Sequence, residues 1–459
     1  MIFLTKNIII LKPHIMKKII LGALALMFGA IGFAQNTSTV TQNGNLQKGE
    51  SNQLGNGNTA TITQTHSGTN SYADPDYFNE SSVIQKGDNN TATVTQFDTG
   101  NGGKTGNDAE VIQTGNGNTA TQTTNAPDYN SDQDVKSTQT GDNNTSTQTI
   151  DGGYTDKFTV EQDGNNNTAT QTGTGVTHNT AKIYQKGDNN TATQTLAGSN
   201  NGYYGGIYAN ERILIEQVGD NNAATQNFTG NGSSHGNSAD IRQEGDNNVA
   251  SQNGNGRNIY ADFNQIGDDN TASSIQTGEA QQVFVDQMGD MNQATVWQDH
   301  NNNYADVNQN GHADKTFINQ KYGSNNTAII NQNGADDGFL HYYPMSNNYT
   351  KVFQGGSYNT ATGNQDGYNN SLNISQEGTN GVIEATQVSD DPNFDKNYGA
   401  FGYNNTATLN QQSGDGNIIN SYQNGNLNHA NVLQNQNGNN ADVDQVGNMN
   451  TAVIIQNGL

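Results

Sequence analysis

The chain repeats a short pattern in which glutamine recurs every eleven residues. Two uninterrupted series are Gln265, Gln276, Gln287, Gln298, Gln309 and Gln320, and Gln423, Gln434, Gln445 and Gln456. Self-similarity at a fixed short period is typical of proteins that stack one small structural unit upon another. About 33 such units lie between Asn36 and Gln456, so the sequence predicts a solenoid.

The fullest units read Q-x-G-x-x-N-x-A-x-x-x-Q, and consecutive units share their glutamine. We expect the repeated residues to form a structural ladder along the fold. In the five clearest copies they are Gln53, Gly55, Asn58, Ala60, Gln64; Gln85, Gly87, Asn90, Ala92, Gln96; Gln287, Gly289, Asn292, Ala294, Gln298; Gln354, Gly356, Asn359, Ala361, Gln365; and Gln445, Gly447, Asn450, Ala452, Gln456. In some units the last glutamine comes two residues early, as at Gln122, Gln171 and Gln194, which keeps it on the same face of a strand.

Within a unit the residues alternate with a period of two, which indicates a strand. Asn90, Ala92 and Gln96 would face inward, with threonines between them facing outward. Gly87-Asp88-Asn89 is turn chemistry, because glycine and asparagine tolerate positive φ. Two strands and two turns fill about 22 residues, so we predict an all-β, two-strands-per-rung β-solenoid of roughly 16–17 rungs with loop insertions. Stacked rungs would place Gln over Gln and Asn over Asn, with their amides hydrogen-bonded along the axis.

The composition alone would indicate disorder, because only 30% of residues are hydrophobic and the net charge is −25. A strict repeat overrides that reading, since low-complexity tracts do not hold an eleven-residue spacing over most of a chain. The acidic charge argues against nucleic acid as a partner. The absence of cysteine excludes disulfides, so stability must come from backbone pairing.

Residues 1–34 differ from the rest of the chain. Lys17-Lys18 precede an apolar run from Ile19 to Phe33, which ends in small residues before Gln35. This pattern predicts a secretory signal peptide, with Met16 as the better start. The run is shorter than a spanning helix needs. We therefore expect residues 35–459 to be exported through the periplasm as a single repeat domain that does not span a membrane.

These units resemble the curlin repeat of curli fibre subunits. Gln53-Leu54-Gly55-Asn56-Gly57-Asn58-Thr59-Ala60 carries the resemblance, as do Gln113–Ala120. The resemblance covers residues 36–456 and implies a secreted functional amyloid of the biofilm matrix. It also implies self-association as the main partnership, and a curli-type outer-membrane secretion and nucleation machinery.

We thus expect a structural subunit of extracellular fibres that supports adhesion and aggregation. The repeat runs to Gln456, close to Leu459, so both end strands should be open and should template the next copy. Three alternatives remain: a minor, nucleating subunit of the same fibre, a monomeric surface adhesin, and an ice-binding protein. The adhesin would use aromatic residues in the insertions Ser67–Phe78, Ala126–Asp134, Gly198–Asn210, Asn333–Ser346 and Val388–Tyr403. If the units alternate regularly, the first three insertions lie on one edge and the last two on the other.

Two regular surface patterns accompany the repeat. One turn position is acidic in many units, at Asp88, Asp142, Asp188, Asp220, Asp246, Asp268 and Asp290. This acidic ladder could slow assembly, bind divalent cations weakly, or be a solvated turn with no further role. The other is a Thr-x-Thr array in six units, beginning with Thr59, Thr61 and Thr63. The array suits ice binding, or reflects only the strand propensity of threonine.

Catalysis finds no support in the sequence. The histidines are scattered and have no metal-ligand or H-E-x-x-H spacing. We expect no enzyme activity, no catalytic residue, no metal and no cofactor.

Overall fold

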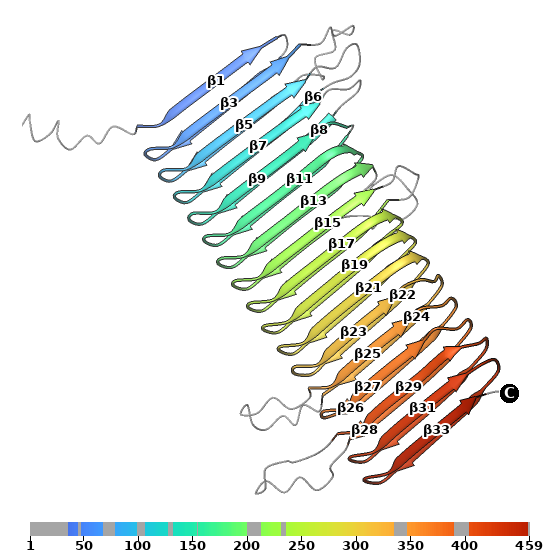
Figure 1. The fold of residues 1–459 in the computed structure, drawn as a ribbon. Coiled ribbons are helices and arrows are strands. Elements are labelled where there is room, and N and C mark those ends of the chain that lie inside the picture. The colour runs from blue at the N-terminus through green and yellow to red at the C-terminus, as the bar shows by residue number, and fades with distance from the viewer. Residues whose placement is uncertain are drawn as a thin grey trace, which may run out of the picture.

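The chain folds into a stack of parallel strands that forms a rod (Figure 1). The computed structural model describes residues 35–44, 47–67, 79–98, 106–126, 132–153, 155–199, 213–230, 236–334, 347–389 and 404–457. Within these ranges there are 33 strands and no helix. No segment of the described part is a helix that could cross a bilayer.

The odd-numbered strands form one parallel sheet, called sheet A. Each pairs with the odd strand that follows it, as β3 does with β5. The strands are β1 (Thr37–Asn43), β3 (Thr59–His66), β5 (Thr91–Asp98), β7 (Thr119–Ala126), β9 (Thr145–Asp151), β11 (Thr168–Thr177), β13 (Thr191–Ser199), β15 (Ala223–Gly230), β17 (Val249–Arg257), β19 (Thr271–Glu279), β21 (Gln293–Asn301), β23 (Lys315–Gln320), β25 (Tyr349–Gln354), β27 (Ser371–Gln376), β29 (Thr406–Ser413), β31 (His429–Asn435) and β33 (Thr451–Asn457).

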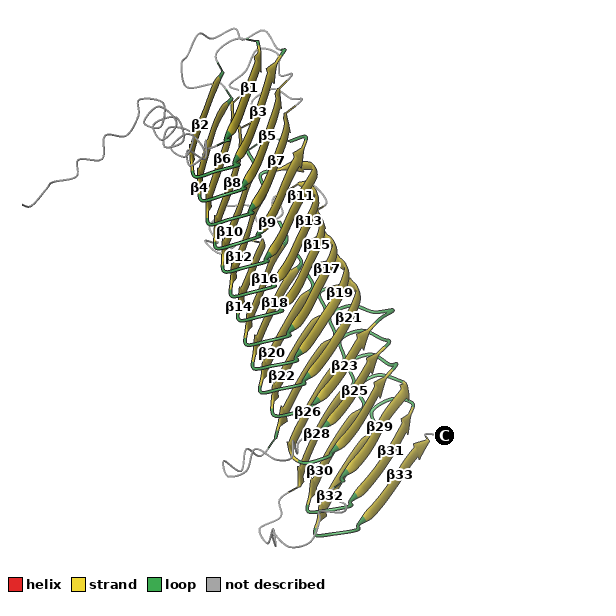
Figure 2. Ribbon diagram, turned by 90° about the vertical axis from the view of Figure 1, so that its left-hand side faces the viewer, coloured by secondary structure: helices red, strands yellow, loops and turns green. Residues whose placement is uncertain are grey.

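The even-numbered strands form the facing parallel sheet, called sheet B. The two layers lie side by side along the rod (Figure 2). The strands are β2 (Lys48–Leu54), β4 (Glu80–Lys86), β6 (Gly106–Thr114), β8 (Asp132–Thr140), β10 (Lys157–Asp163), β12 (Thr180–Lys186), β14 (Ile213–Val218), β16 (Ser238–Glu244), β18 (Tyr260–Ile266), β20 (Gln282–Met288), β22 (Tyr304–Asn310), β24 (Thr327–Asn333), β26 (Thr360–Gly367), β28 (Val382–Ser389), β30 (Ile418–Asn424) and β32 (Asn440–Val446).

The predicted fold class is confirmed. One strand from each sheet makes a rung, so 33 described strands give sixteen and a half rungs. The register follows the repeat: Gln53 pairs with Gln85, and Ala60 with Ala92. A short polar repeat therefore reaches the same position in every turn of the chain.

The core lies between the two sheets and is thin. In β3, Ala60, Ile62 and Gln64 are fully buried, whereas the threonines between them are partly exposed. The same alternation holds along the other interior strands, and alanine, valine and isoleucine columns make up the apolar part of the core. Small inner residues allow the sheets to approach, and polar inner residues need hydrogen-bond partners.

The turns that lead from sheet B to sheet A use positive φ, as predicted. Gly87 has φ 114° and Asn89 has φ 59°. A Cβ atom at Gly87 would collide with the carbonyl oxygen of Gly115 in the next rung. Glycine is therefore required both by the backbone conformation and by the close stacking of turns.

Several predictions concern segments that lie outside the described residues. These are the signal peptide 1–34 and the greater part of each aromatic insertion. The flanking strands nevertheless fix which connections the insertions make. The first three join a sheet A strand to a sheet B strand, and the last two join sheet B to sheet A, so the two groups belong to opposite edges.

Candidate functional site: inner ladders and edge strands

Sheet B contains one glutamine column without interruption. The side-chain Nε2 of each glutamine donates to Oε1 of the glutamine in the next rung at 2.8–2.9 Å. The column comprises Gln53, Gln85, Gln113, Gln139, Gln162, Gln185, Gln217, Gln243, Gln265, Gln287, Gln309, Gln332, Gln365, Gln387, Gln423 and Gln445. Every described strand of sheet B contributes one member.

The glutamines also join the two sheets. Gln85 donates its second amide hydrogen to the backbone oxygen of Thr59 across the core, and Gln64 donates likewise to Lys48. In the sheet B column, each amide from Gln85 to Gln423 thus uses both donors and its acceptor. Because a buried polar group without partners is costly, this bonding explains how a polar core can be stable.

Sheet A contains a glutamine column in three segments. Gln42, Gln64 and Gln96 are bonded in series, and a second series starts at Gln122, which occupies the place of Val94 rather than that of Gln96. The second series ends at Gln252, and a third runs from Gln276 to Gln456 in the original place. Gln122, Gln171 and Gln194 remain buried, on the inner face that a two-residue shift predicts.

The asparagines stack in register but bond differently from our expectation of amide-to-amide pairing. Asn90 Nδ2 donates to the backbone oxygen of Gly115, 2.7 Å away in the next rung, and Asn90 Oδ1 accepts from the backbone nitrogen of Asn118. The shorter side chain reaches the neighbouring turn, so it bonds to backbone groups there. Asn58 and Asn292 likewise donate to a backbone oxygen and accept from a backbone nitrogen of the next rung. Asn359, on the opposite edge of the rod, makes the same two bonds.

The remaining ladder residues occupy consistent places. The alanines Ala60, Ala92, Ala294 and Ala361 are buried, and Ala452 is half-buried in the last strand. The ladder glycines all lie in turns, two residues after the glutamine near the end of the preceding strand. They are Gly55, Gly87, Gly289, Gly356 and Gly447. A Cβ added to each of the first four would collide with the next rung, whereas the space above Gly447 is open.

The acidic ladder is a column of turn residues that bond to backbone. Asp188, Asp220, Asp246, Asp268 and Asp290 occupy five consecutive rungs, and Oδ1 of each accepts a backbone N–H from the rung before it. Asp88 and Asp142 do the same between asparagines. No group of three or more His, Cys, Asp or Glu in the described residues could hold a metal ion. This geometry favours a turn role for the carboxylates.

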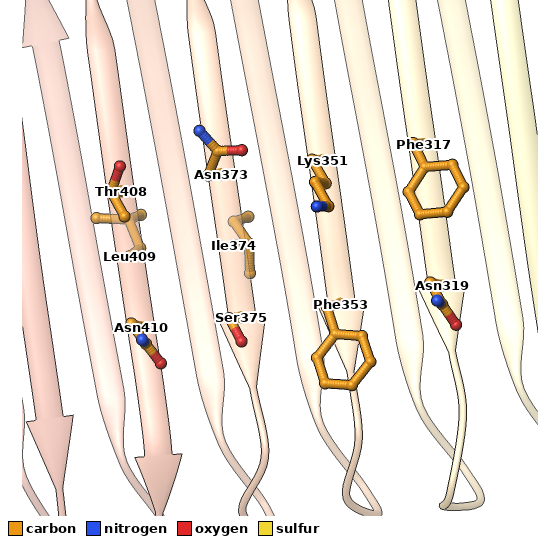
Figure 3. Close-up of a pocket in the computed structure, with 10 residues that line it drawn as sticks. All are labelled: Phe317, Asn319, Lys351, Phe353, Asn373, Ile374, Ser375, Thr408, Leu409 and Asn410. Atoms are coloured by element: carbon orange, nitrogen blue, oxygen red, sulfur yellow. The ribbon is translucent and has the colours of Figure 1, made fainter.

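The outer face of sheet A changes along the rod. The threonine array includes Thr37, Thr39 and Thr41 of β1, so it covers seven successive strands from β1 to β13. Sequence analysis left out this first row. Farther along, a groove of about 380 Å³ is lined by Phe317 and Phe353 and by the polar Asn373 and Thr408 (Figure 3).

Two polar features escaped sequence analysis. His66 Nδ1 lies 3.0 Å from Asp98 Oδ2 at the ends of adjacent strands, and both side chains are nearly buried. Asp156 takes the place of an asparagine before β10: its Oδ1 accepts from the backbone and side chain of Asn179, whereas its Oδ2 is buried without a partner. Burial raises the pKa of the Asp156 carboxyl to about 7. The sequence signal that could have revealed this buried carboxyl is the position of Asp156, where most units have asparagine.

The end strands β1 and β33 are more exposed than the other strands of sheet A. Every residue of β1 is exposed, and in β33 the outward residues are exposed and the inward residues only half-buried. Each pairs on one side, β1 with β3 and β33 with β31. Unpaired strand edges are templates for further pairing, so these edges are the candidate assembly surfaces.

Comparison with known proteins agrees with the repeat. Residues 301–334, which contain β22, β23 and β24, match the family model of the curlin associated repeat. No curated protein matches the chain. The same ladder is repeated from β1 to β33, so the matched residues 301–334 are similar to the rest of the described solenoid, and the match supports a curlin-repeat assignment.

Proposed function

We propose that this chain is the structural subunit of an extracellular, curli-like amyloid fibre in biofilm matrix. Copies add end to end, with the exposed edge of one solenoid pairing with that of the next, and the fibre supports adhesion and aggregation. The role is structural, without enzyme activity or cofactor. Export through the periplasm and a curli-type secretion and nucleation machinery belong to the same proposal. The observation that carries it is that the ladders reach the exposed strands β1 and β33.

The ladders also give assembly a direction. Glutamine Nε2 donates toward the C-terminal end at every step, as from Gln53 to Gln85 and from Gln434 to Gln456. A C-terminal edge therefore offers donors and an N-terminal edge offers the matching acceptors. Head-to-tail addition preserves both the ladders and the parallel pairing.

The first test is fibre formation by residues 35–459 diluted from denaturant. We expect unbranched fibres with a meridional X-ray reflection at about 4.7–4.8 Å. A protein that stays monomeric and rich in β-structure would contradict the proposal. Seeding of fresh protein by traces of fibre then measures whether the chain acts as major subunit or as nucleator.

A matched pair of variants tests the edge itself. Ala452→Lys with Ile454→Lys places charges on the half-buried inner face of β33, and Val453→Lys with Ile455→Lys places them on its exposed outer face. An incoming copy would bury the first pair, at a high cost for an unpaired ammonium. We expect the inner pair to stop elongation and the outer pair to permit it. Equal elongation rates would contradict addition at β33.

Ice binding is a second candidate, favoured by the extension of the threonine array to β1. Thermal hysteresis of the folded chain measures it. Thr121→Lys in the middle of the array should abolish the effect, whereas Asn373→Lys in the lining of the groove, outside the array, should not. Absence of thermal hysteresis in the unmodified chain would rule this candidate out.

A further inference from the structure

The two ends of the described solenoid belong to the same sheet. Sheet A has 17 described strands and sheet B has 16, so residues 37–457 wind through an odd number of half-rungs. The outermost strands, β1 and β33, are both in sheet A. Given the end-to-end stacking proposed above, copies of this solenoid can join in two ways.

In the first way sheet A continues as sheet A. Strand β1 of the next copy pairs with β33, and β2 of that copy then lies two strand spacings from β32. A gap one strand wide remains in sheet B at every junction. The gap leaves the edges of β32 and β2 unpaired, so their backbone hydrogen-bonding groups face an empty place within the fibre.

In the second way the next copy is turned by half a revolution about the rod axis. Its β1 then pairs with β32 and its β2 with β33, so neither sheet has a gap. This joint requires strands of the two sheets to be interchangeable. The inner residues agree: β1 presents Ser38, Val40 and Gln42 where β32 presents Ala441, Val443 and Gln445.

The turns at the two ends also agree. Gln42 and Gln53 enclose the β1–β2 turn at the eleven-residue spacing, as Gln445 and Gln456 enclose the β32–β33 turn. Gly44 has φ 114° and Gly447 has φ 103°. The sequences Asn43-Gly44-Asn45-Leu46-Gln47 and Val446-Gly447-Asn448-Met449-Asn450 match in length and in glycine position. A half-turn that pairs Gln42 with Gln445 places Gly44 directly on Gly447.

The last asparagines provide the bonds for that joint. Asn450 Nδ2 donates within its own rung to Val446, and Asn439 Nδ2 donates to Asn435 and Gln436, whereas Asn90 donates to the next rung. In the half-turn joint, Gly44 of the incoming copy lies over Asn450, as Gly115 lies over Asn90.

We propose that successive copies in the fibre are related by a half-turn about the rod axis, in addition to any twist of the solenoid. Sheet A of one copy continues as sheet B of the next. Each outer surface, such as the threonine array, therefore alternates between opposite sides of the fibre. One half-rung more or fewer in the chain would abolish the alternation.

A single label on sheet A tests the proposal. The chain contains no cysteine, so Thr147→Cys in the half-exposed centre of the threonine array gives one site for a small gold particle. Sixteen and a half rungs at the inter-strand spacing make a subunit of about 80 Å. We expect particles on alternating sides of fibres of residues 35–459, so that those on one side repeat every ~160 Å.

Two deletions within the regular part of the repeat sharpen the test. Removing residues 277–287 takes out one eleven-residue half-rung, and removing residues 277–298 takes out a whole rung. The first should give particles on one side, and the second should keep them alternating. Particles on one side of fibres of the unmodified length would overturn the half-turn while leaving the fibre function standing. Absence of fibres would overturn the fibre function, and the half-turn with it.

Discussion

The two glutamine columns face each other across one core, yet only one of them is continuous. In sheet B the glutamines keep one place from Gln53 to Gln445. In sheet A the column moves by two residues at Gln122 and returns at Gln276. Both arrangements bury one glutamine amide in each strand from β3 to β31. The fold therefore requires a bonded amide in each strand more strictly than it requires a fixed position.

The displaced part of sheet A shows what the vacated place accepts. Apolar residues such as Ile150, Leu196 and Phe228 are buried there. Glycine stands at the same place in β17, where Gly254 lies against the ring of Phe228. Large and small side chains thus complement each other from rung to rung, as close packing demands.

Displacement also changes what lies across the core. Gln96 donates to the backbone oxygen of Asn107, two residues before the inner Ala109 of β6, whereas the displaced Gln148 donates to that of Phe158 in β10. The polar end of the core consequently loses an amide in these rungs. Asp156 lies at that end with one unpartnered oxygen.

The largest expected loss of stability follows from removing a glutamine within the continuous column, and the loss should be smaller when the glutamine ends a segment. Gln217→Ala removes a glutamine that is bonded to Gln185 and Gln243, whereas Gln252→Ala removes one bonded on one side to Gln226. Two orphaned buried groups should cost about 2–6 kcal/mol, and one about half as much. Hydrogen exchange of the flanking strands measures the loss of local stability. Equal losses would show that column continuity has no energetic value.

The pH dependence of Asp156 should come next. Its pKa is raised to about 7 by burial, whereas an unfolded aspartate titrates near 3.9. Between these values the folded chain binds a proton that the unfolded chain does not, so stability falls as pH rises from about 4 to 7 and then levels off. At 1.36 kcal/mol per pKa unit the change is about 4 kcal/mol.

Asparagine at the same position supplies the control for that measurement. Asp156→Asn keeps the acceptor for Asn179 and removes the titrating group. The variant should therefore be more stable than the unmodified chain at pH 8 and nearly independent of pH in this window. Denaturation midpoints at pH 5 and pH 8 measure both effects. An unchanged pH dependence would assign it to other carboxylates.

The repeated part of this fold follows from the sequence because its signals are local. Alternation of Ala92, Val94 and Gln96 with threonines gives strands, and the eleven-residue spacing gives rungs. The backward shift of Gln122 was also predictable, because two residues preserve the face. The hydrogen bonds from Asn90 to backbone atoms could not be predicted, because they depend on the distance between stacked turns.

Contacts between rungs carry no comparable local signal. The repeat was expected to begin at Asn36, but the threonines of β1, which pair in register with those of β3, were not assigned to the threonine array. The buried place of Asp156 is apparent only when its turn is aligned with Asn179. The fit of Phe228 over Gly254 joins residues from different rungs, and a repeat motif does not specify such pairs.

That fit provides a smaller and more local test. A Cβ at Gly254 would collide with Cε1 and Cδ1 of Phe228. Gly254→Ala should cost about 1–3 kcal/mol by overpacking, and Phe228→Leu in the same chain should restore part of the loss by removing the ring. A double-mutant cycle of denaturation midpoints measures the coupling. Additive effects would show that the two places are filled independently.

The smallest change in stability is expected for the acidic ladder on the turns. Its side chains are at least partly exposed, whereas the glutamine columns are buried. Asp246→Asn keeps the oxygen that accepts from Asp220 and removes one charge from between two others. Repulsion between exposed charges is weak, so the variant should gain no more than about 0.5 kcal/mol at low salt. At ~1 M salt the Debye length is about 3 Å and the gain should disappear. Denaturation midpoints at the two salt concentrations measure this, and a loss of stability that depends on added calcium would instead assign the carboxylates to cation binding.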